Sequence, residues 1–159
     1  MASLDRADPV ILGHILQEHR ELHGLLRSTR EAIGLPAVPA PANARAAGCE
    51  RIAKALTALR DHLAEHFHQE EEGGFLEESL ARLPRLASAA REVLAEHPDL
   101  LDEADRLIER TSRGDIPALG WAALCHDVDR FATRLLDHER RENRVVQQGY
   151  NEDLGLVDE

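Results

Sequence analysis

Histidine and glutamate recur along this chain in a fixed order and spacing. Glu18-His19 comes first, and His66 with Glu70 four positions later comes next; both elements then occur a second time. In order, the pattern reads H, HxxxE, H, HxxxE, and its six residues are His19, His66, Glu70, His97, His138 and Glu142. A spacing of four places each histidine and its glutamate one turn apart on one helix face. Inward-facing imidazole and carboxylate groups suit a transition metal better than a dry core, so the pattern predicts a metal site with two carboxylates able to bridge two ions.

Four helices are expected to position these side chains. The first runs from Pro9, preceded by the N-cap residue Asp8, to Ile33, where Gly34 ends it. Residues 35–43 contain three prolines and are expected to form a crossover loop. The remaining helices are expected over 44–73, with a continuation over 75–83 left open, over 84–112, and over 118–148.

All four expected helices are amphipathic, because apolar residues recur in each of them at steps of three and four. The six motif residues fall on these apolar stripes, where charged groups are normally excluded. In an antiparallel bundle the ends of the second and fourth helices meet, so the six side chains can lie at one level. We therefore predict an all-α, antiparallel up-down four-helix bundle over 1–148, followed by a loosely ordered acidic tail over 149–159.

The two halves of the chain are related to each other. Glu18-His19 and Glu96-His97 are 78 residues apart, and the two HxxxE elements are 72 apart. This spacing indicates a pseudo-twofold pair of helical hairpins, with two ions on the axis between them. Pro98 interrupts the symmetry, and it is expected either to kink the third helix or to break it.

With these residues the chain resembles the hemerythrin-like (HHE cation-binding) family over essentially its whole length. The resemblance implies that the four histidines are terminal ligands of a non-heme di-iron centre, and that Glu70 and Glu142 bridge the irons. Softness of the ligands also favours iron, with manganese and zinc as alternatives. Oxygen-carrying members of the family have a fifth histidine four residues after the third-helix histidine, where this chain has Leu101.

His23 is the best candidate to fill the missing position, because it lies one turn beyond His19 on nearly the same face. Its alternative is a partly exposed histidine beside the ligands, and His62 poses the same choice. Glu71 is placed to hydrogen-bond a ligand, whereas Glu72 is expected to be solvated. Three other histidines are expected to face solvent, namely His14, His68 and His126.

Charge and composition exclude several classes of protein. With 30 acidic and 19 basic residues the net charge is -11, which repels nucleic acid and anionic membranes. No apolar run resembles a signal peptide or membrane span, so a cytoplasmic location is expected. Cys49 and Cys125 are too few and too far apart for a zinc-cysteine site or a disulfide framework, and are expected to be reduced packing residues.

The sequence thus favours a di-iron protein that binds a small oxidant (dioxygen, peroxide or nitric oxide) for sensing, delivery or detoxification. Two octahedral ions need about twelve bonds, and four histidines with two bridging carboxylates supply about eight, so positions remain open. One alternative is an enzyme, either peroxide-removing or a ferroxidase, at the same centre. Another is an iron-responsive regulatory bundle, since metal binding contributes folding free energy.

Overall fold

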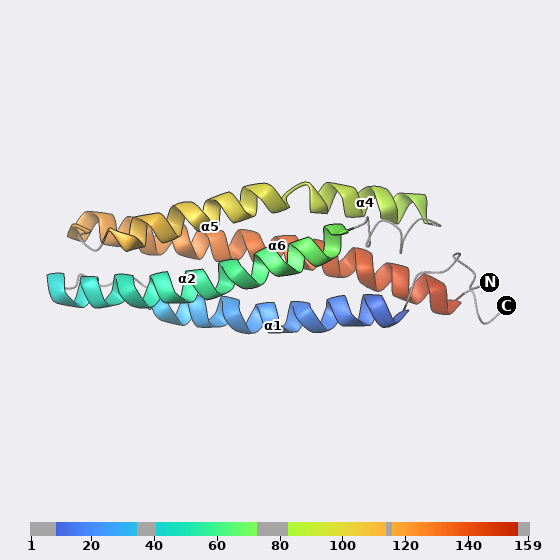
Figure 1. Cartoon of the computed structure of the whole chain (residues 1–159), viewed down its shortest axis with the longest axis horizontal. Helices are drawn as coiled ribbons and strands as arrows, with labels where there is room; N and C mark the ends of the chain where they lie inside the picture. The colour runs from blue at the N-terminus through green and yellow to red at the C-terminus, as the bar shows by residue number, and fades with distance from the viewer. Residues whose placement is uncertain (1–8, 35–40, 73–82, 114–115, 156–159) are drawn as a thin grey trace.

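The computed structural model describes residues 9–34, 41–72, 83–113 and 116–155, and over these residues the chain is helical with no strand. The helices are α1 (Pro9–Ile33), α2 (Ala42–Glu71), α4 (Pro84–Leu94), α5 (His97–Ser112) and α6 (Ala118–Gly155). Because α4 and α5 follow one another along one side, the molecule consists of four rods lying side by side (Figure 1). The predicted all-helical bundle is therefore observed. Among the described helices, none combines the length and apolar character needed to cross a membrane.

The helix boundaries agree closely with the sequence prediction, with one clear difference at the end of the chain. α1 has the predicted bounds, and α2 begins two residues before the predicted position 44. α6 continues past the predicted end at 148 to Gly155, because a single glycine within a polar stretch without proline does not stop a helix. Asp8 and segments 35–40 and 75–82 lie outside the described residues.

The predicted third helix is broken just before Pro98. Glu96 donates its N–H to the carbonyl of Val93, so the last turn of α4 tightens, and α5 starts at His97. Pro98 has no N–H to offer the carbonyl four residues earlier, which removes the hydrogen bond that would continue the helix. Of the two outcomes expected for Pro98, the break is the one that occurs.

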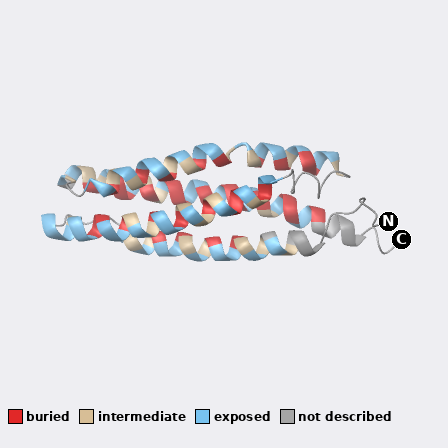
Figure 2. Cartoon of the chain, in the orientation of Figure 1, coloured by how far each residue is buried: buried red, intermediate tan, exposed pale blue. Residues whose placement is uncertain are grey.

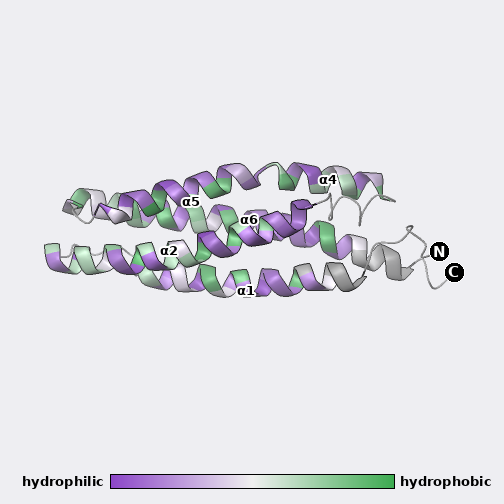
Figure 3. Cartoon of the chain, in the orientation of Figure 1, coloured by the Kyte–Doolittle hydropathy of each residue, from purple (hydrophilic) through white to green (hydrophobic). Residues whose placement is uncertain are grey.

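The apolar core is divided by a polar layer. α1 lies against α2 and α6, α2 lies against α5, and α6 also contacts α4 and α5. Figure 2 shows buried positions recurring along each helix, and Figure 3 shows green apolar positions alternating with hydrophilic ones along the same helices. The larger apolar cluster contains Leu63, Leu100 and Leu135, and the smaller one contains Leu86 and Val146. The motif residues of α1, α5 and α6 lie between residues of the two clusters along the chain, whereas on α2 Glu70 follows the last residue of the larger cluster, Phe67.

Candidate metal centre

The six motif residues come together in the interior of the bundle. α1, α2, α5 and α6 each contribute at least one of them. The six side chains are at most 2% exposed, and they are His19, His66, Glu70, His97, His138 and Glu142. Buried, ionisable groups in such number require partners of opposite charge or a cation.

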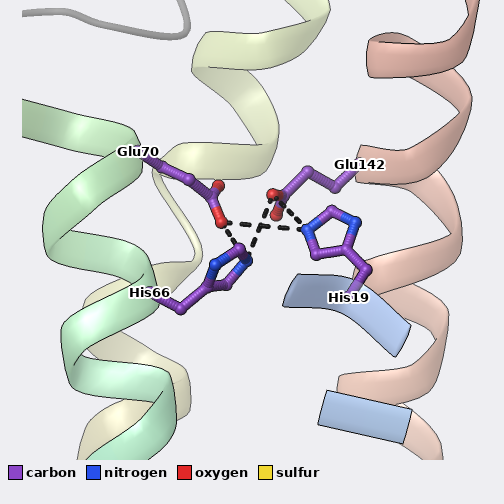
Figure 4. A group of neighbouring side chains, drawn as sticks. All are labelled: His19, His66, Glu70 and Glu142. Atoms are coloured by element: carbon purple, nitrogen blue, oxygen red, sulfur yellow. Dashed lines mark hydrogen bonds and ion pairs between the residues drawn. The ribbon is translucent and has the colours of Figure 1, made fainter. Parts of the chain in front are cut away.

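Four of these residues form the first of two ligand groups, drawn in Figure 4. His19 Nε2 lies 2.9 Å from Glu142 Oε1, and His66 Nε2 lies 3.7 Å from the same oxygen. Glu70 Oε1 contacts His66 Nε2 and lies 3.9 Å from His19 Nε2. One donor atom from each of the four residues lies within 4.8 Å of the others, which is close enough to surround one cation.

The second ligand group consists of His97, His138 and Glu142, and Glu70 approaches one of its histidines. Glu142 Oε2 lies 3.1 Å from His138 Nε2 and 3.8 Å from His97 Nε2. Glu70 Oε2 lies 3.9 Å from His97 Nε2. Each glutamate thus directs one oxygen to the His19–His66 pair and the other toward the second pair of histidines. This is the arrangement that a carboxylate bridge between two ions requires.

The four imidazoles turn Nε2 toward the cluster and Nδ1 toward a partner outside it. His66 donates from Nδ1 to Glu18 Oε2 at 2.8 Å, and His138 donates to Glu96 Oε2 at the same distance. An ionised carboxylate can only accept, so Nδ1 carries a hydrogen, and Nε2 is the nitrogen that would bind a metal once it is deprotonated. Arg141 in turn donates to Glu96 Oε2 at 2.7 Å and holds it in place.

The other two imidazoles are held by the residue that follows a motif glutamate. His97 donates from Nδ1 to Glu71 Oε1 at 3.0 Å, as the sequence suggested for Glu71. His19 Nδ1 contacts Asn143 Oδ1. All four rings are therefore fixed in the tautomer and orientation that metal-binding histidines need.

Several atoms at the centre have no hydrogen-bond partner within the described residues. They are Nε2 of His66, His97 and His138 and both carboxylate oxygens of Glu70. Leaving a buried polar atom unsatisfied costs about 1–3 kcal/mol. A cation between the carboxylates would contact these atoms together, so the residues present fit a metal.

The pKa values of the cluster residues are shifted so that the histidines hold protons next to the carboxylates. Burial alone would lower the pKa of His19 and His66, but the adjacent carboxylates of Glu142 and Glu70 outweigh it and raise these pKa values to about 10 and about 11. Burial and the charge of Glu142 raise the pKa of Glu70. Burial opposes ionisation of Glu142 too, but its close contacts with Glu70, His138 and His19 hold its pKa well below the usual range. Positive charge is thus favoured between the two carboxylates.

His23 lies outside both ligand groups. Its Nε2 is 2.9 Å from Glu139 Oε2, outside hydrogen-bond geometry, and its side chain is 43% exposed. This arrangement gives no support to the prediction that His23 supplies a fifth imidazole. His62 also lies outside the groups; its ring stacks over that of His66 with centroids 6.4 Å apart.

Glu139 is a buried carboxylate that the sequence interpretation missed. It is 1% exposed, and burial raises its pKa to about 8 against the opposing charge of His19. The sequence does contain a signal for it. Steps of four and three from Leu135 through Glu139 to Glu142 place Glu139 on the apolar face of the helix.

The remaining predicted positions agree with the structure. His14, His68, His126 and Glu72 are exposed. Cys49 and Cys125 are buried and free. Apolar residues one turn from the motif residues are also buried and make the surroundings of the centre dry, namely Leu22, Leu63, Val93, Leu100, Leu135 and Val145.

The chain matches the model of a known protein family. The family model described as the Hemerythrin HHE cation binding domain matches residues 10–148, a range that contains all six motif residues and every contact described above between their imidazoles and carboxylates. No curated protein and no solved structure matches the chain.

Proposed function

Because the chain belongs to the hemerythrin HHE cation-binding family, as the resemblance predicted, we propose that its buried cluster holds two iron ions and binds a small oxidant. His19 and His66 would hold one ion, and His97 and His138 the other, with Glu70 and Glu142 bridging. The observation that carries the proposal is the split of each carboxylate, one oxygen toward each histidine pair.

The proposal assumes an up-down antiparallel order of the helices. Figure 1 supports this order: the colour of α1 lightens away from the end marked N, and the colour of α2 advances back toward that end. Contacts between α1 and α2, and between α1 and α6, are consistent with neighbouring rods in such a bundle.

The two proposed metal positions differ in what lies beside them. The Phe67 ring lies flat on His97, with centroids 3.6 Å apart and planes at 6°. At the 72-residue offset that relates the halves, Phe67 corresponds to Glu139, the buried carboxylate beside His23. We therefore place the oxidant at the ion held by His19 and His66, because the position that corresponds to Phe67 on that side is a carboxylate and not an aromatic ring.

The oxidant proposed is dioxygen, peroxide or nitric oxide. Bound iron would supply open coordination positions and a change of oxidation state. The chain's own residues orient the imidazoles through their Nδ1 hydrogen bonds and exclude water with the buried leucines above and below the centre. A dry surrounding of this kind admits small neutral molecules more readily than hydrated ions.

An anaerobic iron titration tests this function. After loading with iron(II), the protein is exposed separately to dioxygen, peroxide and nitric oxide, and optical spectra are recorded. We expect new absorption bands at a stoichiometry of one small molecule per two irons. Rapid, repeated consumption of peroxide would instead assign the enzymatic alternative, and absence of any spectral change would argue for the regulatory one.

A further inference from the structure

A second feature of the molecule lies on its surface, in the groove between α1 and α6. The groove has a volume of about 740 Å³, within the range of small-molecule sites. Four arginines line it, Arg20 and Arg27 from α1 and Arg140 and Arg144 from α6, and no aspartate or glutamate does. In a chain with a net charge of -11, this is a local concentration of positive charge.

The arginines of this groove are poorly paired within the protein. In the part of the chain that the structure describes, Arg20, Arg27 and Arg144 have no hydrogen bond or ion pair. Arg140 has only a loose pair with Asp137 at 3.6 Å, in which both side chains are more than 60% exposed. Four like charges around one depression repel one another unless an anion lies between them.

Another groove of the same protein provides a comparison, because carboxylates lie among its arginines. It also contains four arginines, but Glu103 and Asp127 line it as well. Arg134 pairs with Glu103, and Arg110 donates to Asp127 at 2.7 Å. The two carboxylates offset part of the positive charge of that groove, whereas no carboxylate lines the α1–α6 groove.

The internal pseudo-symmetry provides a second comparison. The offsets of 78 and 72 residues assign to this groove an equivalent surface on α5 and α2. The counterparts of Arg20, Arg27, Arg140 and Arg144 are, in the same order, Pro98, Asp105, His68 and Glu72. Two of the four counterparts are carboxylates and none is an arginine, so the positive charge belongs to one half of the molecule.

Asn143 also differs in charge from its counterpart in the other half of the molecule, Glu71. It supports His19 through Nδ1, as Glu71 supports His97, but it is an amide where the counterpart is a carboxylate. Asn143 lines the arginine groove, so an amide at this position supports the imidazole without bringing negative charge into the groove.

We propose that the α1–α6 groove is a binding site for a small, multiply charged phosphate compound, held by Arg20, Arg27, Arg140 and Arg144. The planar guanidinium group presents paired donors that match phosphate oxygens. A small ligand fits better than a nucleic acid, because the rest of a chain with this net charge repels a long polyanion. The groove adjoins the metal centre, because His19 and Asn143 also line it. The four arginines are not metal ligands, so the proposal does not depend on a bound metal.

Binding of pyrophosphate, inorganic phosphate and ADP to the purified protein tests the proposal, by calorimetry at low salt. We expect pyrophosphate to bind, with an affinity that falls as salt is added. Arg27→Ala and Arg144→Ala should each weaken binding by about tenfold or more. Asn143→Glu should do the same by adding a carboxylate to the groove. Tighter binding of ADP than of pyrophosphate would identify an organic phosphate as the ligand, and equal or weaker binding a free one; both support the site.

Arg130→Ala is the matched control, because Arg130 lines the groove that also contains Glu103 and Asp127. It should leave the affinity within about twofold. Each variant is checked for helix content, and each titration is repeated after treatment with a chelator. The proposal is wrong if none of the three compounds binds at millimolar concentration, or if the control loses as much affinity as Arg27→Ala. Binding that disappears with the chelator and ignores the arginine variants would place the phosphate on the metal, and would also overturn it.

Discussion

Single residues next to the motif determine how its histidines are held. Glu18 and Glu96 each precede a motif histidine, yet each accepts from the Nδ1 of a different one, on the next rod. Glu71 and Asn143 each follow a motif glutamate and accept from a histidine of the other half of the chain. The extended pattern therefore has a glutamate before each single motif histidine and a glutamate or asparagine after each motif glutamate. In each half of the chain, these residues accept hydrogen bonds from one histidine of the same half and one of the other half.

Substitution of a shared carboxylate tests the proposed bridge. Glu142 belongs to both ligand groups, so Glu142→Ala should reduce the iron content from two per chain to near zero. His68→Ala, on the exposed face of α2, should keep the full content. Metal analysis of the two variants after identical growth gives the comparison. Equal metal content in both would contradict the bridging assignment.

Metal binding should release protons. In the metal-free protein the pKa values of His19 and His66 are raised to about 10 and about 11, so both rings hold protons at pH 7. A metal needs neutral imidazole, and protons therefore compete with it less as the pH rises from 6 to 8. We expect the metal affinity to increase over this range. Calorimetric titrations in two buffers of different ionisation heat measure the protons released, and release of none would refute the prediction.

Glu139 should make the metal-free protein less stable at higher pH. Its folded pKa of about 8 lies above the ordinary value of 4.5, so between these values the folded state holds a proton that the unfolded state loses. Its contribution to the free energy of unfolding falls by up to about 1.4 kcal/mol per pH unit across this interval. Glu139→Gln removes the effect and should stabilise the chelator-treated protein more at pH 7.5 than at pH 5. Urea unfolding at both pH values measures this; an equal gain at both would contradict it.

At the residue scale, the sequence predicts the six motif side chains because they combine an unusual type with a regular spacing. It did not identify Glu139 or Asn143. Spacing from Leu135 places Glu139 at the edge of the apolar face, but this signal is weak for a carboxylate, and the packing of α1 against α6 shows that Glu139 is buried. The role of Asn143 depends on a contact with His19, which is 124 positions away in the chain.

Among the elements, the long helices are predictable and their interruptions less so. Apolar periodicity and proline-glycine punctuation give the bounds of α1 correctly, because both are local properties. The sequence left open whether Pro98 kinks the helix or breaks it, since the outcome depends on whether surrounding rods hold the two parts in line. The break makes His97 the first residue of α5.

The approach of α2 to α6 depends on a glycine. A Cβ added to Gly48 would lie 2.4 Å from the Trp121 ring, closer than carbon atoms can approach. Gly48→Ala should therefore force the rods apart or move the indole, and lower the free energy of unfolding by about 1–3 kcal/mol. Gly24→Ala is the control: no atom lies within 4 Å of its Cβ, and it should stabilise α1 by about 0.5–1 kcal/mol. In thermal unfolding, the melting temperature should fall for Gly48→Ala and rise for Gly24→Ala. An unchanged or higher melting temperature for Gly48→Ala would contradict the close contact.

At the scale of the whole molecule, the chain surrounds a charged layer with two apolar clusters. Such a layer costs stability when it is empty, and a bound cation would offset that cost. The pseudo-twofold relation explains how one short pattern places ligands on four rods, because each hairpin supplies two histidines and one glutamate. The halves differ outside the centre, where Phe67 and Glu139 occupy corresponding positions.

Metal analysis of the intact protein tests the central claim most directly. Protein produced with ample iron is purified without chelators, and its iron, manganese and zinc are measured by mass spectrometry against the protein concentration. We expect close to two metal ions per chain, with iron as the main one. A folded, helical protein that contains no metal and takes up no iron on titration would contradict it.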